Sequence, residues 1–129
     1  MGTILIVDDE QEMREISYQI FRIEGYEVDT AADAESAMFK IKNNKYDFLL
    51  VDLVLPGRLN GLDIIKKVRQ ILPKIKIIAY SGFSGIDIAE KVIRAGANNF
   101  LAKPFRRQEI ISVVNGLHNE NKFQHEMIN

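Results

Sequence analysis

Hydrophobic residues along the chain gather in five short runs, separated by longer segments in which apolar positions recur at helical spacing. The runs at 4–7, 48–51, 75–79 and 100–102 are mostly continuous rather than alternating. Continuous runs of this length are typical of parallel strands that helices cover on both faces. The weaker run at 26–30 alternates, so it is predicted to be a strand at an edge of the sheet.

The segments between the runs predict amphipathic helices. Their apolar stripes are Met13, Ile16, Ile20 and Ile23; Ala34, Ala37, Met38 and Ile41; Leu62, Ile65, Val68 and Leu72; Ala89, Val92 and Ile93; and Ile110, Val113, Val114 and Leu117. Gly25, Pro73 and Gly96 follow three of these stripes, where they favour a helix end. The pairs with the spacing of an N-cap and an acid three residues later are Asn60 with Asp63 and Ser84 with Asp87.

Strand and helix therefore alternate five times, which predicts an α/β domain with a parallel sheet and right-handed crossovers. The expected fold is a flavodoxin-like, doubly wound, five-stranded parallel sheet in the order 2-1-3-4-5 with five helices. Residues 1–119 are predicted to form this domain. Residues 120–129 are polar and carry no clear stripe, so they are predicted to be a polar C-terminal tail or a frayed helix end.

Length and composition limit the class of protein. A chain of 129 residues fits one domain, and 47% hydrophobic with 27% charged residues is ordinary for a globular protein. The net charge of −1 gives no reason to expect direct binding to nucleic acid or to a membrane. The absence of cysteine excludes disulfides and thiolate metal sites. Because the N-terminus also lacks the pattern of a signal peptide, a cytoplasmic location is expected.

Polar residues fall where the predicted strands end. Asp8 and Asp9 follow the first strand, Asp52 ends the third, Ser81 follows the fourth and Lys103 follows the fifth. The carboxyl ends of parallel strands meet at one edge of the sheet, and ligands bind there near the point where the strand order reverses. In the order 2-1-3-4-5 that point lies between the first and third strands, which supply all three aspartates.

Three converging carboxylates repel one another, so a cation is implied. With oxygen ligands only, the metal should be hard, and Mg2+ suits best, with Mn2+ as a substitute. Such an ion would neutralise an incoming phosphoryl group, and aspartate is a competent acceptor that forms an acyl phosphate. Lys103 would add a second positive charge, and the Ser81 hydroxyl would hydrogen-bond a phosphoryl oxygen.

Four motifs in this order, ILIVDDE, LLVDLVLPG, IIAYSGF and FLAKPF, resemble those of response-regulator receiver domains of two-component signal transduction. The resemblance covers residues 4–117. Within this family, the chain is similar to the single-domain regulators of chemotaxis and sporulation. It implies a Mg2+-dependent transfer of a phosphoryl group from a histidine kinase or histidine phosphotransfer protein. It also implies a switch that signals to a downstream protein through the fourth helix, fifth strand and fifth helix, and no enzymatic activity beyond the domain's own phosphorylation and dephosphorylation.

The resemblance also implies a role for individual residues. These are Asp52 as phosphoacceptor, Asp8 and Asp9 as the acidic metal pair, the Val54 carbonyl as a further metal ligand, Ser81 and Lys103 as phosphoryl-binding groups, Phe100 with Ser81 as the switch, and Pro104 after a cis peptide bond. Val54 and Phe83 stand where the family tunes hydrolysis of the acyl phosphate. Both are apolar and cannot orient a water molecule, so slow autodephosphorylation is expected.

Two departures from the family pattern are visible. The loop PGRLNG, beside Val54, is one residue longer than the common pattern. Phe100 lacks a hydroxyl, so an inward rotation would change packing without a new hydrogen bond.

Simpler structural roles stay open for each of these residues: helix capping for Asp8 and Asp9, turn formation for Asp52 and Ser81, a surface position for Lys103 and the core for Phe100.

Two other functions fit these residues less well than the receiver does. An aspartate-based phosphohydrolase needs a second acid two residues after the nucleophile, where this chain has Val54. A flavodoxin-like cofactor site needs a phosphate-binding loop after the first strand, and the acids at 8–10 would repel phosphate in the absence of a metal ion. The main alternative is a receiver cut from a longer regulator with a DNA-binding or enzymatic output domain. The oligomeric state is open between a monomer and a phosphorylation-dependent dimer.

Overall fold

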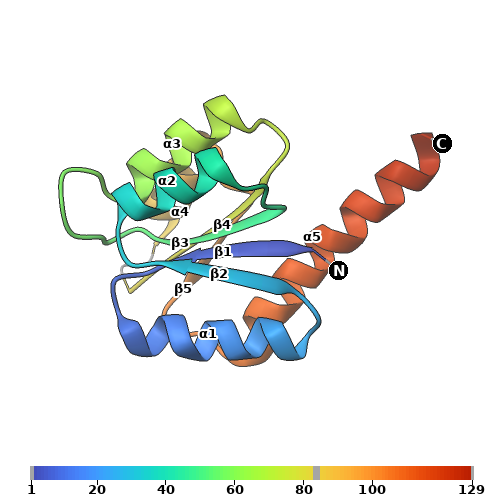
Figure 1. Cartoon of the computed structure of the whole chain (residues 1–129). Coiled ribbons are helices and arrows are strands. Elements are labelled where there is room, and N and C mark those ends of the chain that lie inside the picture. Colours follow the sequence, from blue (N-terminus) through green and yellow to red (C-terminus); the bar gives the residue numbers. More distant parts are fainter. Residues whose placement is uncertain (1, 83–84, 129) are drawn as a thin grey trace.

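The structure is a computed structural model that describes residues 2–82 and 85–128, with side chains described as far as residue 119. Strand and helix alternate along the whole chain (Figure 1). The elements are β1 (Thr3–Val7), α1 (Gln11–Ile23), β2 (Glu27–Ala31), α2 (Ala34–Asn43), β3 (Phe48–Asp52), α3 (Gly61–Ile71), β4 (Lys76–Ser81), α4 (Ile86–Ala95), β5 (Asn99–Ala102) and α5 (Arg107–Ile128).

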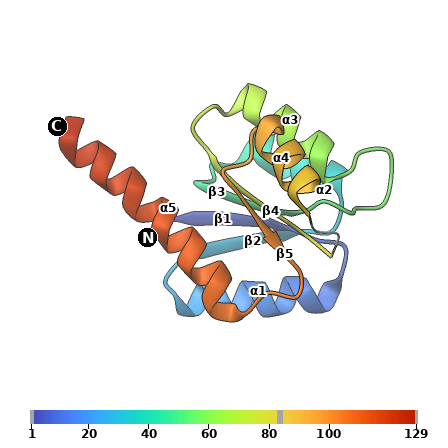
Figure 2. The ribbon, with the colours of Figure 1, turned by 180° about the vertical axis from the view of Figure 1, so that it is seen from behind.

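All five strands are parallel, and their order in the sheet is β2-β1-β3-β4-β5. Helices α1 and α5 cover one face of the sheet, and α2, α3 and α4 cover the other, as both views of the ribbon show (Figures 1 and 2). The predicted doubly wound fold is therefore confirmed. The alternating run is indeed an edge strand, because within the described part of the chain β2 pairs with β1 alone.

The continuous hydrophobic runs supply two cores at once. In β1, Leu5 and Val7 pack beneath α2, α3 and α4, whereas Ile4 and Ile6 pack beneath α1 and α5. All four are fully buried, and each such side chain contributes roughly 1.5–3 kcal/mol to folding. Because successive residues of a strand point to opposite faces, a strand buried on both sides must be apolar at every position.

Helix starts differ in how well the sequence predicts them. The Asn60 side chain accepts a hydrogen bond from the Asp63 N–H at 3.0 Å, and the Asp63 carboxylate accepts one from the Asn60 N–H at 3.1 Å. This confirms the predicted capping box at the start of α3. The second prediction was wrong by one residue: the N-cap of α4 is Gly85, with no side-chain cap, and Ser84 lies outside the described residues.

Helix α5 is 22 residues long and includes residues 120–128, which the sequence predicted to be a polar tail or a frayed helix end. Its C-terminal part extends beyond the edge of the sheet (Figure 1). Proline and glycine, the residues that most strongly end a helix, do not occur between residues 117 and 128. The proposed boundary at residue 119 stays a prediction. Among the described residues, no helix combines the length and apolar character needed to cross a bilayer.

Candidate functional site

The alternation of the strands brings three side chains to the same side of the sheet at its carboxyl edge. Asp52 lies opposite Tyr80 in the β3–β4 register, and Asp8 follows Ile6 by two residues along β1. Residues two apart in a strand share a face, so all three point to the side that α1 and α5 cover. The Asp8 N–H donates to the Ala31 carbonyl at 3.1 Å and extends the β1–β2 ladder to this position.

Asp52 is a buried carboxylate with a donor on each oxygen. Its Oδ2 accepts from the Lys103 Nζ at 2.9 Å, and its Oδ1 accepts from the Val54 N–H at 2.9 Å. Burial raises the pKa of Asp52, and the charge of Asp8 adds to this, against the opposing effects of Val54 and Lys103. Ionised Asp52 is therefore less favourable in the folded protein than in water.

Asp8 is fully buried and is held from several directions. Its Oδ1 accepts from the Glu10 N–H at 2.9 Å, and its Oδ2 accepts from the Tyr80 hydroxyl at 2.8 Å. The Asp8 backbone carbonyl accepts from the Arg14 guanidinium at 2.8 Å. Both the backbone and the carboxylate plane of Asp8 are thereby fixed at the start of α1.

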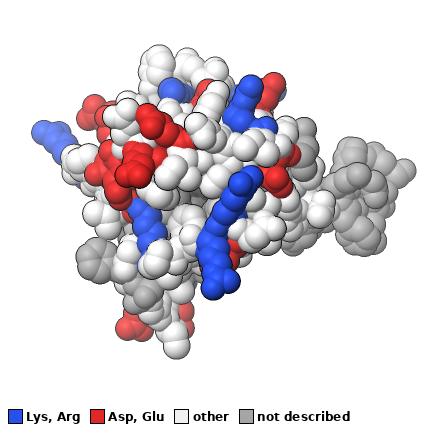
Figure 3. Space-filling model, turned by 90° about the horizontal axis from the view of Figure 1, so that it is seen from below, with Lys and Arg blue, Asp and Glu red and all other residues white. Residues whose placement is uncertain are grey.

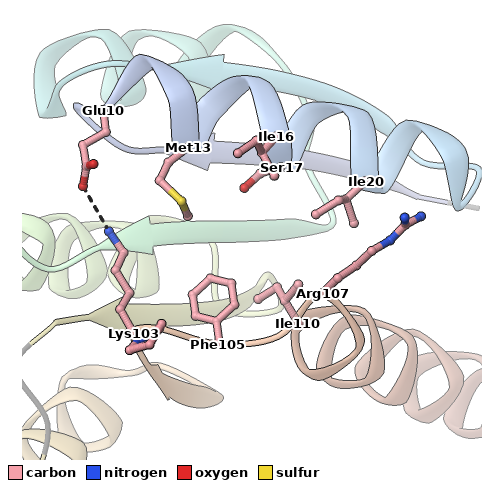
Figure 4. A pocket seen from close by; sticks show the side chains of 10 residues that line it. Glu10, Met13, Ile16, Ser17, Ile20, Lys103, Phe105, Arg107 and Ile110 are labelled. Carbon is pink, nitrogen blue, oxygen red and sulfur yellow. Dashed lines mark ion pairs between the residues drawn. The ribbon is translucent and has the colours of Figure 1, made fainter.

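Lys103 is the cation that faces these acids. Its Nζ lies 2.9 Å from Asp52 Oδ2, 3.6 Å from Asp8 Oδ2 and 3.5 Å from Glu10 Oε1, the last pair being drawn in Figure 4. Burial lowers the pKa of Lys103, but its hydrogen bond with Asp52 and the charges of all three acids outweigh burial and leave the pKa raised. Lys103 therefore stays protonated at neutral pH.

Tyr80 completes the cluster, and the sequence analysis did not predict it. Its side chain is 1% exposed, and its ring lies edge-on to Phe105 at 5.7 Å, with the Lys103 Nζ 5.0 Å from its centroid. Burial and the neighbouring Asp8 raise the pKa of Tyr80 well above its usual range, so its hydroxyl stays a proton donor. A signal was available, since a buried tyrosine hydroxyl normally finds a hydrogen-bond partner.

The other predicted residues lie around this cluster. Ser81 is buried at the end of β4, and its carbonyl accepts from the Lys103 N–H at 2.8 Å. The peptide bond between Lys103 and Pro104 is cis. Phe100 lies opposite Ala79 in the β4–β5 register and packs, half-buried, against the core beneath α2, α3 and α4. The switch and phosphoryl-binding roles of these residues stay predictions.

Carboxylate oxygens of Asp8, Glu10 and Asp52 lie within 4.8 Å of one another and could hold a metal ion. An all-oxygen set of this kind fits a hard cation. The sequence predicted Asp9 rather than Glu10 in this group, but Asp9 is exposed and lies outside it. The acidic run at 8–10 was the available signal for Glu10, but its side-chain position depends on where α1 begins and on its pairing with Lys103.

Two apolar residues were predicted to govern the lifetime of a phosphoryl group. The Val54 side chain is 53% exposed, and its backbone N–H fixes one oxygen of Asp52. The Val54 side chain beside this carboxylate is apolar, and its role in the lifetime of a phosphoryl group stays a prediction. Phe83 lies outside the described residues.

A groove of about 490 Å³ runs between α1 and α5 and reaches the acidic cluster, which consists of Asp8, Glu10 and Asp52. We call it the α1–α5 groove; its apolar lining is formed by Met13, Ile16, Ile20, Phe105 and Ile110. Glu10 and Lys103 stand at the end nearest the strand ends (Figure 4). Seen from this side of the molecule, acidic side chains gather at the end where α1 begins (Figure 3). An apolar surface thus adjoins a charged one.

Comparison with known proteins agrees with this geometry. A sequence model of the response regulator receiver domain matches residues 4–115. The chain is 35% identical over 113 residues to the chemotaxis protein CheY of Thermotoga maritima, covering 87% of this chain and 93% of the relative. It is 32% identical to sporulation initiation phosphotransferase F of Bacillus subtilis, covering 86% and 89% of the two chains.

It is also 34% identical to the DNA-binding transcriptional regulator NtrC of Azospirillum brasilense over 93% of this chain, but it spans only 25% of that protein. It likewise spans 24% of the nitrogen assimilation regulatory protein NtrX of Azorhizobium caulinodans. Among solved structures, a CheY-like receiver domain from Methanospirillum hungatei superposes with a TM-score of 0.90 at 28% identity, covering 96% of this chain and 98% of that one. From its motifs, its strand order and these matches, the chain belongs to the response regulator receiver domain family of two-component signal transduction.

Proposed function

We propose that Asp52 accepts a phosphoryl group from the phosphohistidine of a histidine kinase or histidine phosphotransfer protein. The observation that carries this proposal is the position of Asp52. It is a buried carboxylate at the carboxyl edge of the sheet, with the Lys103 Nζ 2.9 Å from one oxygen and a second buried acid, Asp8, beside it. Such a costly arrangement of like charges is typical of functional sites.

In the transfer, a carboxylate oxygen of Asp52 attacks the phosphorus and forms an acyl phosphate, while the bond from phosphorus to the imidazole nitrogen breaks. Mg2+ held by the carboxylates of Asp8, Asp9 and Asp52 and by the Val54 carbonyl, or Mn2+ in its place, would neutralise charge on the phosphoryl oxygens. Lys103 exchanges its contact with the carboxylate for one with the phosphoryl group. The domain thus promotes only its own phosphorylation and dephosphorylation.

Asp9 remains a proposed metal ligand although it is exposed, because its carboxylate is available to a cation. Among the described residues, no side-chain hydrogen bond or ion pair involves the Asp9 carboxylate. It lies next to Asp8 and is available to a cation, whereas the Glu10 carboxylate is paired with Lys103. The oxygen-only donor set supports a hard ion in either arrangement.

New hydrogen bonds from Ser81 and Lys103 to the phosphoryl oxygens drive the switch. Each charge-assisted bond contributes about 1.5–3 kcal/mol. About 5.5 kcal/mol moves a two-state equilibrium from 1:99 to 99:1, so two such bonds approach the required bias. The responding surface is α4-β5-α5, with Phe100 rotating inward. Ile86 and Ile93 of α4 are 77% and 47% exposed, and these apolar side chains suit a surface that a protein partner reads.

The α1–α5 groove is the proposed docking surface for the phosphodonor protein. A donor must bring a histidine to the strand ends, and this groove is an apolar surface that reaches them. The occupant we propose is a helix of the kinase or phosphotransfer protein, because a helix with an apolar stripe fits a groove between two helices. The adjacent acids attract a basic flank of such a partner.

The downstream target is proposed to be a separate protein, with no direct binding to nucleic acid and a monomer or phosphorylation-dependent dimer as the signalling form. CheY and phosphotransferase F, both nearly spanned by this chain, support that arrangement. The alternative is control of a DNA-binding or enzymatic domain in a longer regulator, which the match to NtrC supports. Both would use the α4-β5-α5 surface in the cytoplasm.

The test is phosphorylation by a small acyl phosphate with and without Mg2+, followed by mass spectrometry. We expect one phosphoryl group on the wild-type protein, dependent on Mg2+, and none on Asp52→Asn. Asp29→Asn is the matched control, because Asp29 also accepts a hydrogen bond but lies away from the cluster, and it should be labelled normally. Persistent labelling of Asp52→Asn would refute the assignment.

A further inference from the structure

The hydrogen bond between Tyr80 and Asp8 links β4 to the residue that follows β1, and these two strands are not neighbours in the sheet. Tyr80 lies in β4 and Asp8 follows β1, and β3 with Asp52 at its end lies between them. The 2.8 Å hydrogen bond therefore passes over the end of the strand that carries the acceptor. Both partners are buried, at 1% and 0% exposure, so water does not compete for the bond.

Tyr80 restrains three parts of the site at once. Its hydroxyl holds Asp8 Oδ2, and its ring lies under the Lys103 ammonium at 5.0 Å. Its backbone carbonyl accepts from the Leu53 N–H at 3.0 Å, which fixes the first residue after Asp52. A single residue thus touches the acid, the lysine and the loop beside the acceptor.

The hydroxyl is not needed for packing. The ring belongs to the core beneath α1 and α5, which also contains Ile78 and Leu50, and a phenylalanine ring would fill the same volume. What the hydroxyl adds is a second donor to Asp8, opposite the Glu10 N–H on the other oxygen. A carboxylate has about four lone-pair positions, so Asp8 keeps positions for a cation or its water while its plane is held.

We propose that Tyr80 is a positioning residue of the cation site, whose hydroxyl holds the Asp8 carboxylate in the orientation that favours Mg2+. This role rests on the proposed metal-dependent function. Hydrogen-bond partners of metal ligands set the orientation of those ligands, and their loss typically weakens metal binding about 10- to 100-fold. Loss of the Tyr80 hydroxyl should weaken Mg2+ binding alone, so its effect on phosphorylation should disappear at saturating Mg2+.

The test compares Tyr80→Phe with Tyr46→Phe, which removes an equivalent bond, from a Tyr46 hydroxyl to Asp29 Oδ2, outside the site. Calorimetric titration with Mg2+ alone should give a dissociation constant raised about tenfold or more in Tyr80→Phe and unchanged in Tyr46→Phe. Labelling by an acyl phosphate should be slow in Tyr80→Phe at low Mg2+ and should recover the wild-type rate at saturating Mg2+. Urea unfolding shows whether each variant is folded under these conditions.

A double-mutant cycle with Asp8→Asn keeps the inference testable even if Tyr80→Phe is less stable. Once the Asp8 carboxylate is absent, the Tyr80 hydroxyl should have no further effect on Mg2+ affinity. Wild-type Mg2+ affinity in Tyr80→Phe, or equal effects of Tyr80→Phe with and without the Asp8 carboxylate, would overturn the inference and leave the proposed function intact. A wild-type protein that neither binds Mg2+ nor becomes labelled would overturn both.

Discussion

Gly61, the first residue of α3, lies so close to the backbone of Asp52 that a Cβ placed on it would fall 2.2 Å from the Asp52 carbonyl oxygen. The Gly61 N–H donates to the Leu53 carbonyl at 3.1 Å, so the approach is fixed by a hydrogen bond as well. Because the contact is with backbone atoms rather than with a flexible side chain, neither partner can move aside cheaply. The long loop PGRLNG therefore ends against the acceptor itself.

Gly61→Ala should destabilise the protein by about 3 kcal/mol, the upper part of the usual range for overpacking, because the added methyl group forces α3 away from Asp52. Gly116→Ala is the matched control. Gly116 is exposed within α5 and no atom lies within 4 Å of an added Cβ, so alanine should stabilise the protein by about 0.5–1 kcal/mol. Urea unfolding measures both, and equal effects would contradict the steric argument.

Asp52→Asn should make the fold more stable although it abolishes phosphorylation. Burial, with a contribution from Asp8, raises the pKa of Asp52, so the ionised form is disfavoured in the folded state. In metal-free buffer at neutral pH, the neutral isostere should raise the free energy of unfolding by about 0.5–2 kcal/mol, a common gain from relieving a functional site. Urea unfolding in the presence of a chelator is the measurement.

The same variant has a defined pH dependence. An acid whose pKa is raised by folding binds its proton more tightly in the folded than in the unfolded state, so the wild-type protein gains stability as Asp52 becomes protonated. The advantage of Asp52→Asn should shrink as the pH falls through the raised pKa. It should vanish below the ordinary value of 3.8, where both states bind the proton. If the extra stability of Asp52→Asn did not change with pH, the raised pKa of Asp52 would not be its cause.

Asp9→Asn and Glu10→Gln distinguish two arrangements of the metal site. Loss of a true ligand should weaken Mg2+ binding at least as much as loss of a ligand's hydrogen-bond partner, about 10- to 100-fold, and we expect this for Asp9→Asn. The Glu10 side chain is 62% exposed and paired with Lys103, so Glu10→Gln should change the affinity by about fivefold at most. Calorimetric titration with Mg2+ measures both affinities. A larger loss of affinity in Glu10→Gln than in Asp9→Asn would make Glu10 the ligand.

Ile16→Glu should slow phosphotransfer from a protein donor by about tenfold or more, because it places a charge in the α1–α5 groove. Labelling by a small acyl phosphate should be unaffected, since that donor needs no docking surface. Phe39→Glu is the control: Phe39 is 69% exposed on α2, which covers the opposite face of the sheet. Equal slowing with both donors would show that Ile16 acts on the chemistry rather than on docking.

The phosphorylated protein should persist for many minutes at neutral pH. The half-exposed Val54 beside Asp52 has no polar group to orient a water molecule for attack on the acyl phosphate. Val54→Asn supplies such a group and should shorten the lifetime, whereas Val54→Ala should not. Loss of label from the purified protein measures both, and a wild-type half-life of seconds would be incompatible with this role of Val54.

Most of the fold could be predicted because the strands inside the sheet are buried on both faces and leave continuous apolar runs. Strand β5 departs from this rule, since its run is continuous although it lies at an edge and none of its residues is buried. Runs such as 4–7 are apolar at every position, while the edge strand β2 alternates. The polar residues at the strand ends then follow from topology alone, since parallel strands end at one edge. Asp8, Asp52 and Lys103 were found in this way.

The continuous apolar runs also explain why the position of Tyr80 in the site could not be predicted. In a continuous apolar run the pattern does not show which face of the sheet a residue occupies. That Asp8, Asp52 and Tyr80 lie on the same face can therefore be seen only once the register of the strands is known. The close approach of Gly61 to Asp52 is likewise a property of packing rather than of sequence. For residues 120–128 the sequence left a helix end and a tail both open, because a polar composition without glycine or proline fits either, and α5 extends to Ile128 in the structure.

Tyr80 has a further consequence for how the protein can be observed. The chain contains no tryptophan and four tyrosines, so phenol groups dominate its near-ultraviolet absorption and its fluorescence. Of these, Tyr80 alone has its hydroxyl bonded to a carboxylate of the acidic cluster; Tyr26 and Tyr46 bond Asn115 and Asp29 elsewhere, and Tyr18 lies on the surface of α1. Any change of charge at the strand ends acts directly on that chromophore, which makes Tyr80 an intrinsic optical reporter of site occupancy without a dye or a label.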